Sequence, residues 1–283
     1  MLFQIISAAI AATTFALSAS AATSNDAKTK IIVPLYSWSE SCWPELQAAA
    51  QANPTVQWII IINPNSGPSL DPNDPSLYCV PTLRSVLPAG SIIAGYVRTG
   101  YNARSLGEIE ADVKQYASWK NIKVKGGKTP KLDGIFFDET SDTTTTRLQS
   151  FASIARTQFS NRLVKIISNP GTAVGKEYFS SATYVVDYES ALPDYKFSNL
   201  PTTSASQLRQ SIVMIHDFDS SKTPLTQILK PLVDAKVGGV FITDLKIQEE
   251  DIYQKFGSNW GEFVRTVATL NAGGSGTGTC SST

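Results

Sequence analysis

Short apolar runs alternate with longer amphipathic segments along the chain. The runs are rich in Ile, Val, Leu and aromatic residues and are bounded by Gly, Pro, Asn or Asp, which is typical of strands buried on both faces of a sheet. Eight runs predict strands at residues 31–36, 56–62, 92–97, 132–137, 163–167, 183–188, 212–215 and 237–243. Helices are predicted between them, among others at residues 44–52, 106–119, 146–159, 224–233 and 260–268.

Eight strands that alternate with helices in one domain predict an α/β fold, a single (β/α)8 TIM-type barrel. A doubly wound open sheet is the alternative, because it has the same alternation.

The two ends of the chain differ in composition from the rest. Residues 1–21 form an uncharged apolar run that ends in Ala-Ser-Ala, which predicts a secretory signal peptide and a mature chain that begins near Ala22. A transmembrane anchor is less favoured, because the run is short, rich in Ala, Ser and Thr, and has no basic flank. We expect the barrel domain over residues 22–270, a flexible Gly/Ser/Thr-rich tail over 271–283, and a protein that is secreted, extracellular or associated with the cell wall.

Charge is balanced, with 24 basic and 24 acidic residues. The totals leave no basic field for nucleic acid and no polybasic patch for a membrane, so we expect neither partner. With 42% hydrophobic residues the chain can bury a large core, and we expect a monomer.

Cysteine and histidine are scarce. In a secreted chain two of three cysteines are expected to pair, and Cys42 and Cys79 each lie in a loop-like context after a predicted strand, so we predict a disulfide between them, with Cys280 left over. No cysteine spacing fits a metal motif, and His216 is the single histidine, so we expect no metal and no cofactor.

The stretch LDGIFFDET, residues 132–140, is the most informative one in the chain. An apolar run ends there in two adjacent carboxylates, Asp138 and Glu139, and in α/β folds the groups that do chemistry lie where such strands end. The acids could instead cap the next helix, since carboxylates favour helix N-termini.

Other predicted strands also end in polar or aromatic residues. These are Asn63, Arg98, Tyr101, Asn169, Asp187, Glu189, His216 and Asp244. Taken alone, each has a structural explanation, such as a turn at Asn169-Pro-Gly171. Together they predict a polar cleft at the carboxyl ends of the strands.

Paired carboxylates fit glycoside hydrolysis best. The chain lacks the GxSxG motif of a serine hydrolase and the GxxxxGK[ST] motif of a phosphate-binding loop. One carboxylic acid can protonate a leaving oxygen while a carboxylate attacks the sugar or activates water. Flat aromatic faces for sugar rings could come from Tyr36, Trp38, Trp43, Tyr96 and Tyr101.

Six strings occur in an order that resembles the spherulin 4 family of fungal secreted proteins. They are VPLYSW, NPNSGP, GYVRTGY, DGIFFDET, NPG and FITDL, and the similarity runs from about Ile31 to Val267. The resemblance implies a barrel and the activity of glycoside hydrolase family 135, an endo-acting enzyme that cuts α-1,4-linked N-acetylgalactosamine in galactosaminogalactan.

The resemblance assigns roles residue by residue. The family's Asp-Glu pair falls on Asp138 and Glu139, and its Glu after the sixth strand falls on Glu189. We expect Asp138 as nucleophile, Glu189 as acid/base and Glu139 as a positioning residue in a mechanism that retains configuration. Arg98 stands where the family string GYVHTxY has a His, and Asp187 stands in an apolar position; since Asp187 is two residues from Glu189, we expect it on the same face as a reserve acid.

The substrate is expected to be a polysaccharide. Substrate-binding residues are expected to be Tyr36, Trp38, Asn63, Tyr96, Arg98, Tyr101, Asn169, Asp187, His216 and Asp244. The alternative is a non-catalytic cell-wall or spore-coat protein that binds glycan on the same barrel.

Overall fold

The computed structural model describes residues 28–140, 145–161, 163–200, 204–247 and 252–275. The expected signal peptide, Cys280 and residues 276–283 of the expected tail lie outside these ranges. In the part of the chain that is described, no helix is long and apolar enough to cross a membrane.

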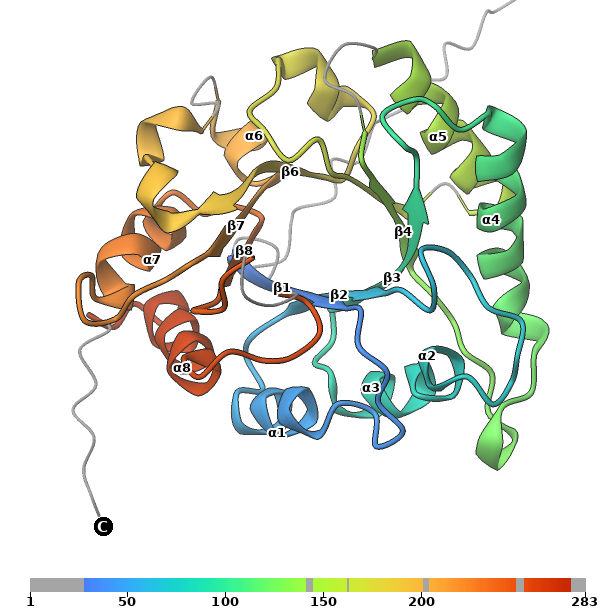
Figure 1. Cartoon of the computed structure of the whole chain (residues 1–283), viewed down its shortest axis with the longest axis horizontal. Helices are drawn as coiled ribbons and strands as arrows, with labels where there is room; N and C mark the ends of the chain where they lie inside the picture. Colours follow the sequence, from blue (N-terminus) through green and yellow to red (C-terminus); the bar gives the residue numbers. More distant parts are fainter. Residues whose placement is uncertain (1–27, 141–144, 162, 201–203, 248–251, 276–283) are drawn as a thin grey trace, which may run out of the picture.

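Eight parallel strands close into one barrel, and the helices surround it (Figure 1). The strands are β1 (Lys30–Leu35), β2 (Trp58–Ile62), β3 (Ile92–Arg98), β4 (Gly134–Asp138), β5 (Lys165–Ser168), β6 (Tyr184–Ala191), β7 (Ser211–His216) and β8 (Gly239–Ile242). Each strand pairs with the next, and β8 returns to β1 through Ile31 and Val240. The predicted (β/α)8 barrel is confirmed, and the open-sheet alternative is wrong.

Helices follow most of the strands. They are α1 (Pro44–Ala52), α2 (Pro75–Tyr78), α3 (Val80–Val86), α4 (Leu106–Ser118), α5 (Thr145–Gln158), α6 (Ala205–Leu208), α7 (Leu225–Asp234) and α8 (Trp260–Asn271). The pattern of apolar residues predicted the five longest of these helices. It missed α2, α3 and α6, because helices of 4 to 7 residues are too short to show a helical period.

Alternate residues of β4 face opposite layers. Phe137 stacks on Phe151 of the outer helix α5, with ring centroids 5.1 Å apart, while Phe136 stacks on Tyr96 of β3 at 6.0 Å. Because side chains alternate along a strand, Asp138 lies on the same side as Phe136. The strand therefore delivers the carboxylate of Asp138 to the mouth of the barrel.

A capping box fixes the start of α4. The Ser105 hydroxyl accepts a hydrogen bond from the Glu108 backbone N–H at 3.2 Å, and the Glu108 carboxylate accepts one from the Ser105 N–H at 2.7 Å. Two backbone donors that the helix leaves free are thereby satisfied. The cap also fixes the end of the loop that carries Tyr101.

The last helix is tied to the first strand. Asn271, where the tail was expected to begin, is the final residue of α8. Its side-chain amide donates to the Thr29 carbonyl at 2.9 Å and accepts from the Thr29 N–H at 3.2 Å.

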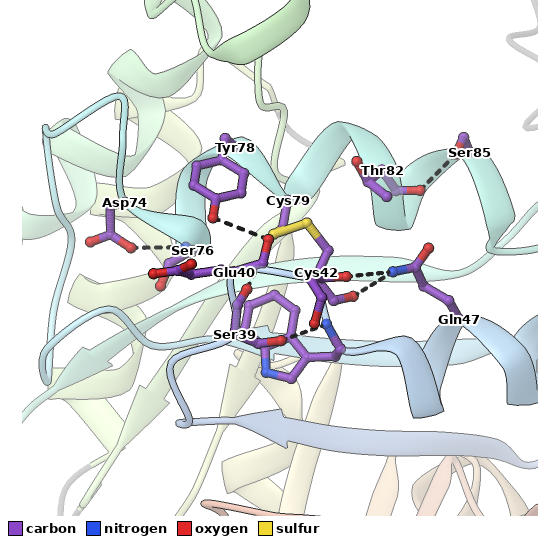
Figure 2. Close-up of a disulfide and its surroundings, with 12 residues drawn as sticks. Ser39, Glu40, Cys42, Gln47, Asp74, Ser76, Tyr78, Cys79, Thr82 and Ser85 are labelled. Carbon is purple, nitrogen blue, oxygen red and sulfur yellow. Dashed lines mark hydrogen bonds between the residues drawn. A yellow bond between two sulfur atoms is a disulfide. The ribbon is translucent and has the colours of Figure 1, made fainter.

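A disulfide joins Cys42 and Cys79, as predicted, with an S–S distance of 2.03 Å (Figure 2). It links the loop after β1 to the junction of α2 and α3. Tyr78 reinforces the link, because its hydroxyl donates to the Glu40 carbonyl at 3.2 Å.

We predict that replacing Cys42 and Cys79 together by Ser lowers the free energy of unfolding by about 2–4 kcal/mol, because the 37-residue loop regains its freedom in the unfolded chain. Urea unfolding measures this change. Cys280→Ser, which leaves the bridge in place, is the control, and equal stabilities of the two proteins would contradict the prediction.

Candidate active site

Asp138 lies at the end of β4 and receives hydrogen bonds from two side chains. The Tyr96 hydroxyl donates to Oδ2 at 2.6 Å, and the Asn169 amide donates to Oδ1 at 2.8 Å. Tyr96 belongs to the neighbouring strand β3 and Asn169 directly follows the neighbouring strand β5, so neither is a helix N-terminus. The helix-capping interpretation of Asp138 is therefore not supported.

Asn169 holds two carboxylates at once. Its side-chain nitrogen donates to Asp138 and also to Glu189 Oε2, the latter at 2.6 Å. The amide orientation is set by the turn Asn169-Pro-Gly171, since Asn169 Oδ1 accepts the Gly171 N–H at 2.8 Å. The Gly171 carbonyl in turn accepts the Glu189 N–H at 3.2 Å. This turn therefore positions Glu189 through both its backbone and its carboxylate.

Tyr253 binds the carboxylate cluster, which we define as Asp138, Glu139 and Glu189. Its hydroxyl donates to Glu189 Oε1, and its ring contacts the edge of Tyr36 with centroids 5.2 Å apart. Sequence reasoning missed Tyr253, because it lies in an irregular segment after β8 and 64 residues from its partner. Tyr253 does not lie at the end of a predicted strand, so the apolar pattern gave no signal for it.

Glu139 points toward Arg98 at the rim. Arg98 Nε donates to Glu139 Oε2 at 2.8 Å. Arg98, which replaces the His of the family string, therefore has its charge paired with that of Glu139. Glu139 adopts a left-handed backbone with φ 52°, which costs about 1–3 kcal/mol in a non-glycine residue. The Tyr101 N–H and the Thr99 hydroxyl both donate to its carbonyl at 2.7 Å and hold this conformation.

Burial raises the pKa of Asp138 to about 6. The hydrogen bond from Tyr96 opposes this shift, and the nearby negative charge of Glu189 adds to it. Desolvation disfavours the charged carboxylate, whereas donors that point at it favour the charge. Asp138 therefore ionises within the physiological pH range.

The candidate sugar-binding aromatic residues differ in exposure. Trp38 and Tyr101 are 66% and 68% exposed. Desolvation, followed by the negative charges of the cluster, raises the pKa of Tyr101. Tyr96 and Trp43 are buried, so neither offers a free face, contrary to expectation. Tyr36 is half-buried against Tyr96 and Tyr253.

Asp187 does not join the cluster, and the expectation that it shares a face with Glu189 is wrong. The register of β6 on β7 skips from Val186 to Tyr188, so a bulge breaks the alternation between them. Asp187 is 1% exposed and accepts a hydrogen bond from the Ser211 hydroxyl at 2.8 Å. Burial raises its pKa to about 7.

Three other expected binding residues make no hydrogen bond to the cluster in the described part of the chain. Asn63 is half-buried at the end of β2, and its Oδ1 is buried without a partner there. His216 is buried, and its Nδ1 lies 2.9 Å from Asp217 Oδ1. Asp244 accepts a hydrogen bond from Ser258 and lines a polar hollow of about 490 Å³ together with Asp217.

Within the described residues, no group of three or more His, Cys, Asp or Glu side chains could hold a metal ion. The chemistry that the cluster can supply is proton transfer and nucleophilic attack by carboxylates.

A family model described as Spherulin4, spherulation-specific family 4, matches residues 30–267. The chain belongs to this family. The match spans the barrel from β1 into α8 and includes every residue of the cluster, so the family resemblance seen in the sequence is confirmed.

The chain is similar to a curated protein and to a solved structure. Spherulin-4 of Physarum polycephalum is 33% identical over 181 residues, which cover 64% of this chain and 49% of that protein. The chain thus matches about half the length of this relative. The crystal structure of Aspergillus clavatus Sph3 in complex with GalNAc matches with a TM-score of 0.70 and 26% identity, covering 85% of this chain and 98% of that one.

We predict that Asp187→Asn raises stability above pH 7 and preserves activity. Because the pKa of Asp187 is raised by folding, the folded protein keeps a proton that the unfolded chain loses, and wild-type stability falls as pH rises from about 4 to about 7. The variant has no such titrating group, so we expect its free energy of unfolding to exceed that of the wild type by about 1–3 kcal/mol at pH 8 and to equal it near pH 4.

Urea unfolding at pH 4 and pH 8 measures the Asp187 effect. A variant that lost activity while its stability followed the wild type at both pH values would return Asp187 to the site.

Proposed function

We propose that this chain is an endo-acting glycoside hydrolase that cleaves an α-1,4-linked N-acetylgalactosamine or galactosamine polymer, similar to galactosaminogalactan, with retention of configuration. The single observation that carries the proposal is the pair of carboxylates held by one amide at the mouth of the barrel. The carboxyl ends of barrel strands are where catalytic groups of this fold gather.

The separation of the two carboxylates favours retention. Asp138 Oδ1 and Glu189 Oε2 lie 2.8 Å and 2.6 Å from the same Asn169 nitrogen. The distance between these two oxygens therefore cannot exceed the sum of the two hydrogen-bond lengths. Retaining glycosidases hold their carboxyl groups about 5–5.5 Å apart, whereas inverting ones leave about 6.5–9.5 Å for a water molecule. The shorter separation favours a nucleophile over an activated water.

The surroundings of the two carboxylates suit different roles. Asp138 has a donor on each oxygen, which stabilises its charged form, and we assign it as the nucleophile. Glu189 comes from the half-buried end of β6, where a leaving group and then a water can reach it, and we assign it as the acid/base. Glu139 and Arg98 form the rim pair that positions the substrate beside them.

The substrate class is inferred from the family and from the charge of the rim. Sph3 was solved in complex with GalNAc, and Trp38 and Tyr101 offer exposed rings on which a sugar can stack. Arg98 is the cation that pairs with Glu139, so the cluster keeps a net negative charge. A negative field favours polymers with free amino groups over acidic polysaccharides.

We predict that Asp138→Asn and Glu189→Gln each reduce activity by about a thousandfold or more, because the first removes the nucleophile and the second removes the acid/base. Release of reducing ends from a partly deacetylated α-1,4-galactosamine polymer measures the loss. The exposed Asp194→Asn and Glu177→Gln are matched controls that should keep activity.

The same assay separates hydrolysis from glycan binding alone. A wild-type protein that binds the polymer and releases no reducing ends would support the non-catalytic alternative. Full activity of both cluster variants would contradict the proposed mechanism.

We predict that kcat/KM falls below about pH 6, because a nucleophile must be ionised and the pKa of Asp138 is raised to about 6. Tyr96→Phe removes a hydrogen bond that lowers this pKa, so the acid limb of the profile should move up by about one pH unit. Tyr188→Phe, whose hydroxyl donates to Ala191 and not to the cluster, is the control.

The direction in which activity changes around pH 6 shows whether Asp138 is the nucleophile or the general acid. Activity that falls instead as pH rises through 6 would make Asp138 the general acid and Glu189 the nucleophile. A limb that stays in place in Tyr96→Phe would contradict the link to Asp138.

A further inference from the structure

Five exposed lysines gather in the loop between α4 and β4, and we call them the basic face: Lys120, Lys123, Lys125, Lys128 and Lys131. Residues 113–132 contain six lysines and no Asp or Glu. This light-green segment lies at the lower right of Figure 1. No lysine of the basic face has an ion-pair partner among the described residues.

Buried anchors alternate with these lysines and fix the loop. Trp119, Val124 and Pro130 are buried, and the Trp119 indole N–H donates to the Ser69 carbonyl at 2.8 Å. The Val124 N–H donates to the Lys128 carbonyl at 3.0 Å and closes a tight turn. The charges are therefore presented by a structured loop, which lowers the entropy lost when a partner binds.

The surface beside the loop is hollowed. Lys123, Lys128 and Lys131 line a hollow of about 630 Å³ with Arg84 and Asp133. Lys120 and Lys131 line a second one of about 250 Å³, so the two hollows share a lysine. The one carboxylate that lines them, that of Asp133, is already bound by Arg84 and by the Ile93 N–H at 2.8 Å.

The basic face and the carboxylate cluster lie at opposite ends of β4. Asp133, which lines both hollows, directly precedes the strand, and Asp138 ends it. The chain is balanced overall, so the rest of it carries the compensating excess of acids. The balanced totals of acidic and basic residues did not show this cluster of lysines, because total charge does not show how charge is distributed.

We propose that the basic face binds an acidic polysaccharide, one with carboxylate, sulfate or phosphate groups along the chain. Lysines act as point charges that tolerate variable geometry, which suits a polymer with repeated anions. Base stacking on nucleic acid needs exposed aromatic rings, and the single aromatic residue of the loop, Trp119, is fully buried. Insertion into a bilayer needs exposed apolar side chains, and no large one is exposed between residues 119 and 133.

Binding of the full chain to polygalacturonate tests the proposal, with neutral dextran for comparison. The variant Lys123→Gln/Lys125→Gln/Lys128→Gln/Lys131→Gln removes four charges from the face. The control Lys176→Gln/Lys196→Gln/Lys230→Gln/Lys236→Gln removes four exposed charges elsewhere. Thermal melts of both variants establish that they are folded.

We expect the wild type to bind polygalacturonate at low salt and to lose affinity as salt rises, since the contacts are between exposed charges. The basic-face variant should bind at least about tenfold more weakly, and the control within about twofold of the wild type. Equal binding by the two variants would overturn the proposal. Tighter binding to phosphatidylserine vesicles or to double-stranded DNA than to polygalacturonate would overturn the assignment to a polysaccharide.

Discussion

The hydrogen bonds from the Asn169 amide hold the candidate site together. Two carboxylates at close range repel each other, and one NH2 group that donates to both offsets that repulsion. The amide can do this in one orientation only, and the turn enforces that orientation by binding its oxygen to the Gly171 N–H. The Asn-Pro-Gly string is therefore both a turn and a clamp.

The rest of the barrel brings partners to this clamp. Alternation along β4 places Asp138 at the mouth, and β3 supplies Tyr96 as its second donor. Strain at Glu139 is retained because two donors bind its carbonyl. Strained residues of this kind are common at functional sites, because strain persists only where surrounding contacts enforce it.

Much of the fold could be predicted from sequence because it depends on local pattern. Each strand is a short apolar run, and the abrupt end of the run at Asp138 predicted its place at the mouth. The position of Asp187 was mispredicted because alternation assumes a regular strand, and a one-residue bulge has no marker in the apolar pattern. Tyr253 was missed for a different reason: its contact with Glu189 joins segments far apart in the chain.

The role of Tyr96 also differed from expectation. An aromatic residue near a strand end suggested a surface for sugar rings, yet its ring is buried and its hydroxyl serves Asp138. A sequence shows the residue type, whereas burial depends on neighbours that only the closed barrel supplies. The distribution of charge could not be predicted for the same reason. The totals of acidic and basic residues are equal, yet acids lie at one end of β4 and lysines at the other.

The anomeric configuration of the first product distinguishes a retaining from an inverting reaction. The wild-type protein would be mixed with an α-1,4-linked galactosamine polymer, and the new reducing ends would be followed by proton NMR before they mutarotate. Two carboxylates held by one amide predict that the α-anomer appears first, because double displacement retains configuration. A β-anomer that appears first, or no reducing ends at all, would contradict the proposed retaining hydrolysis.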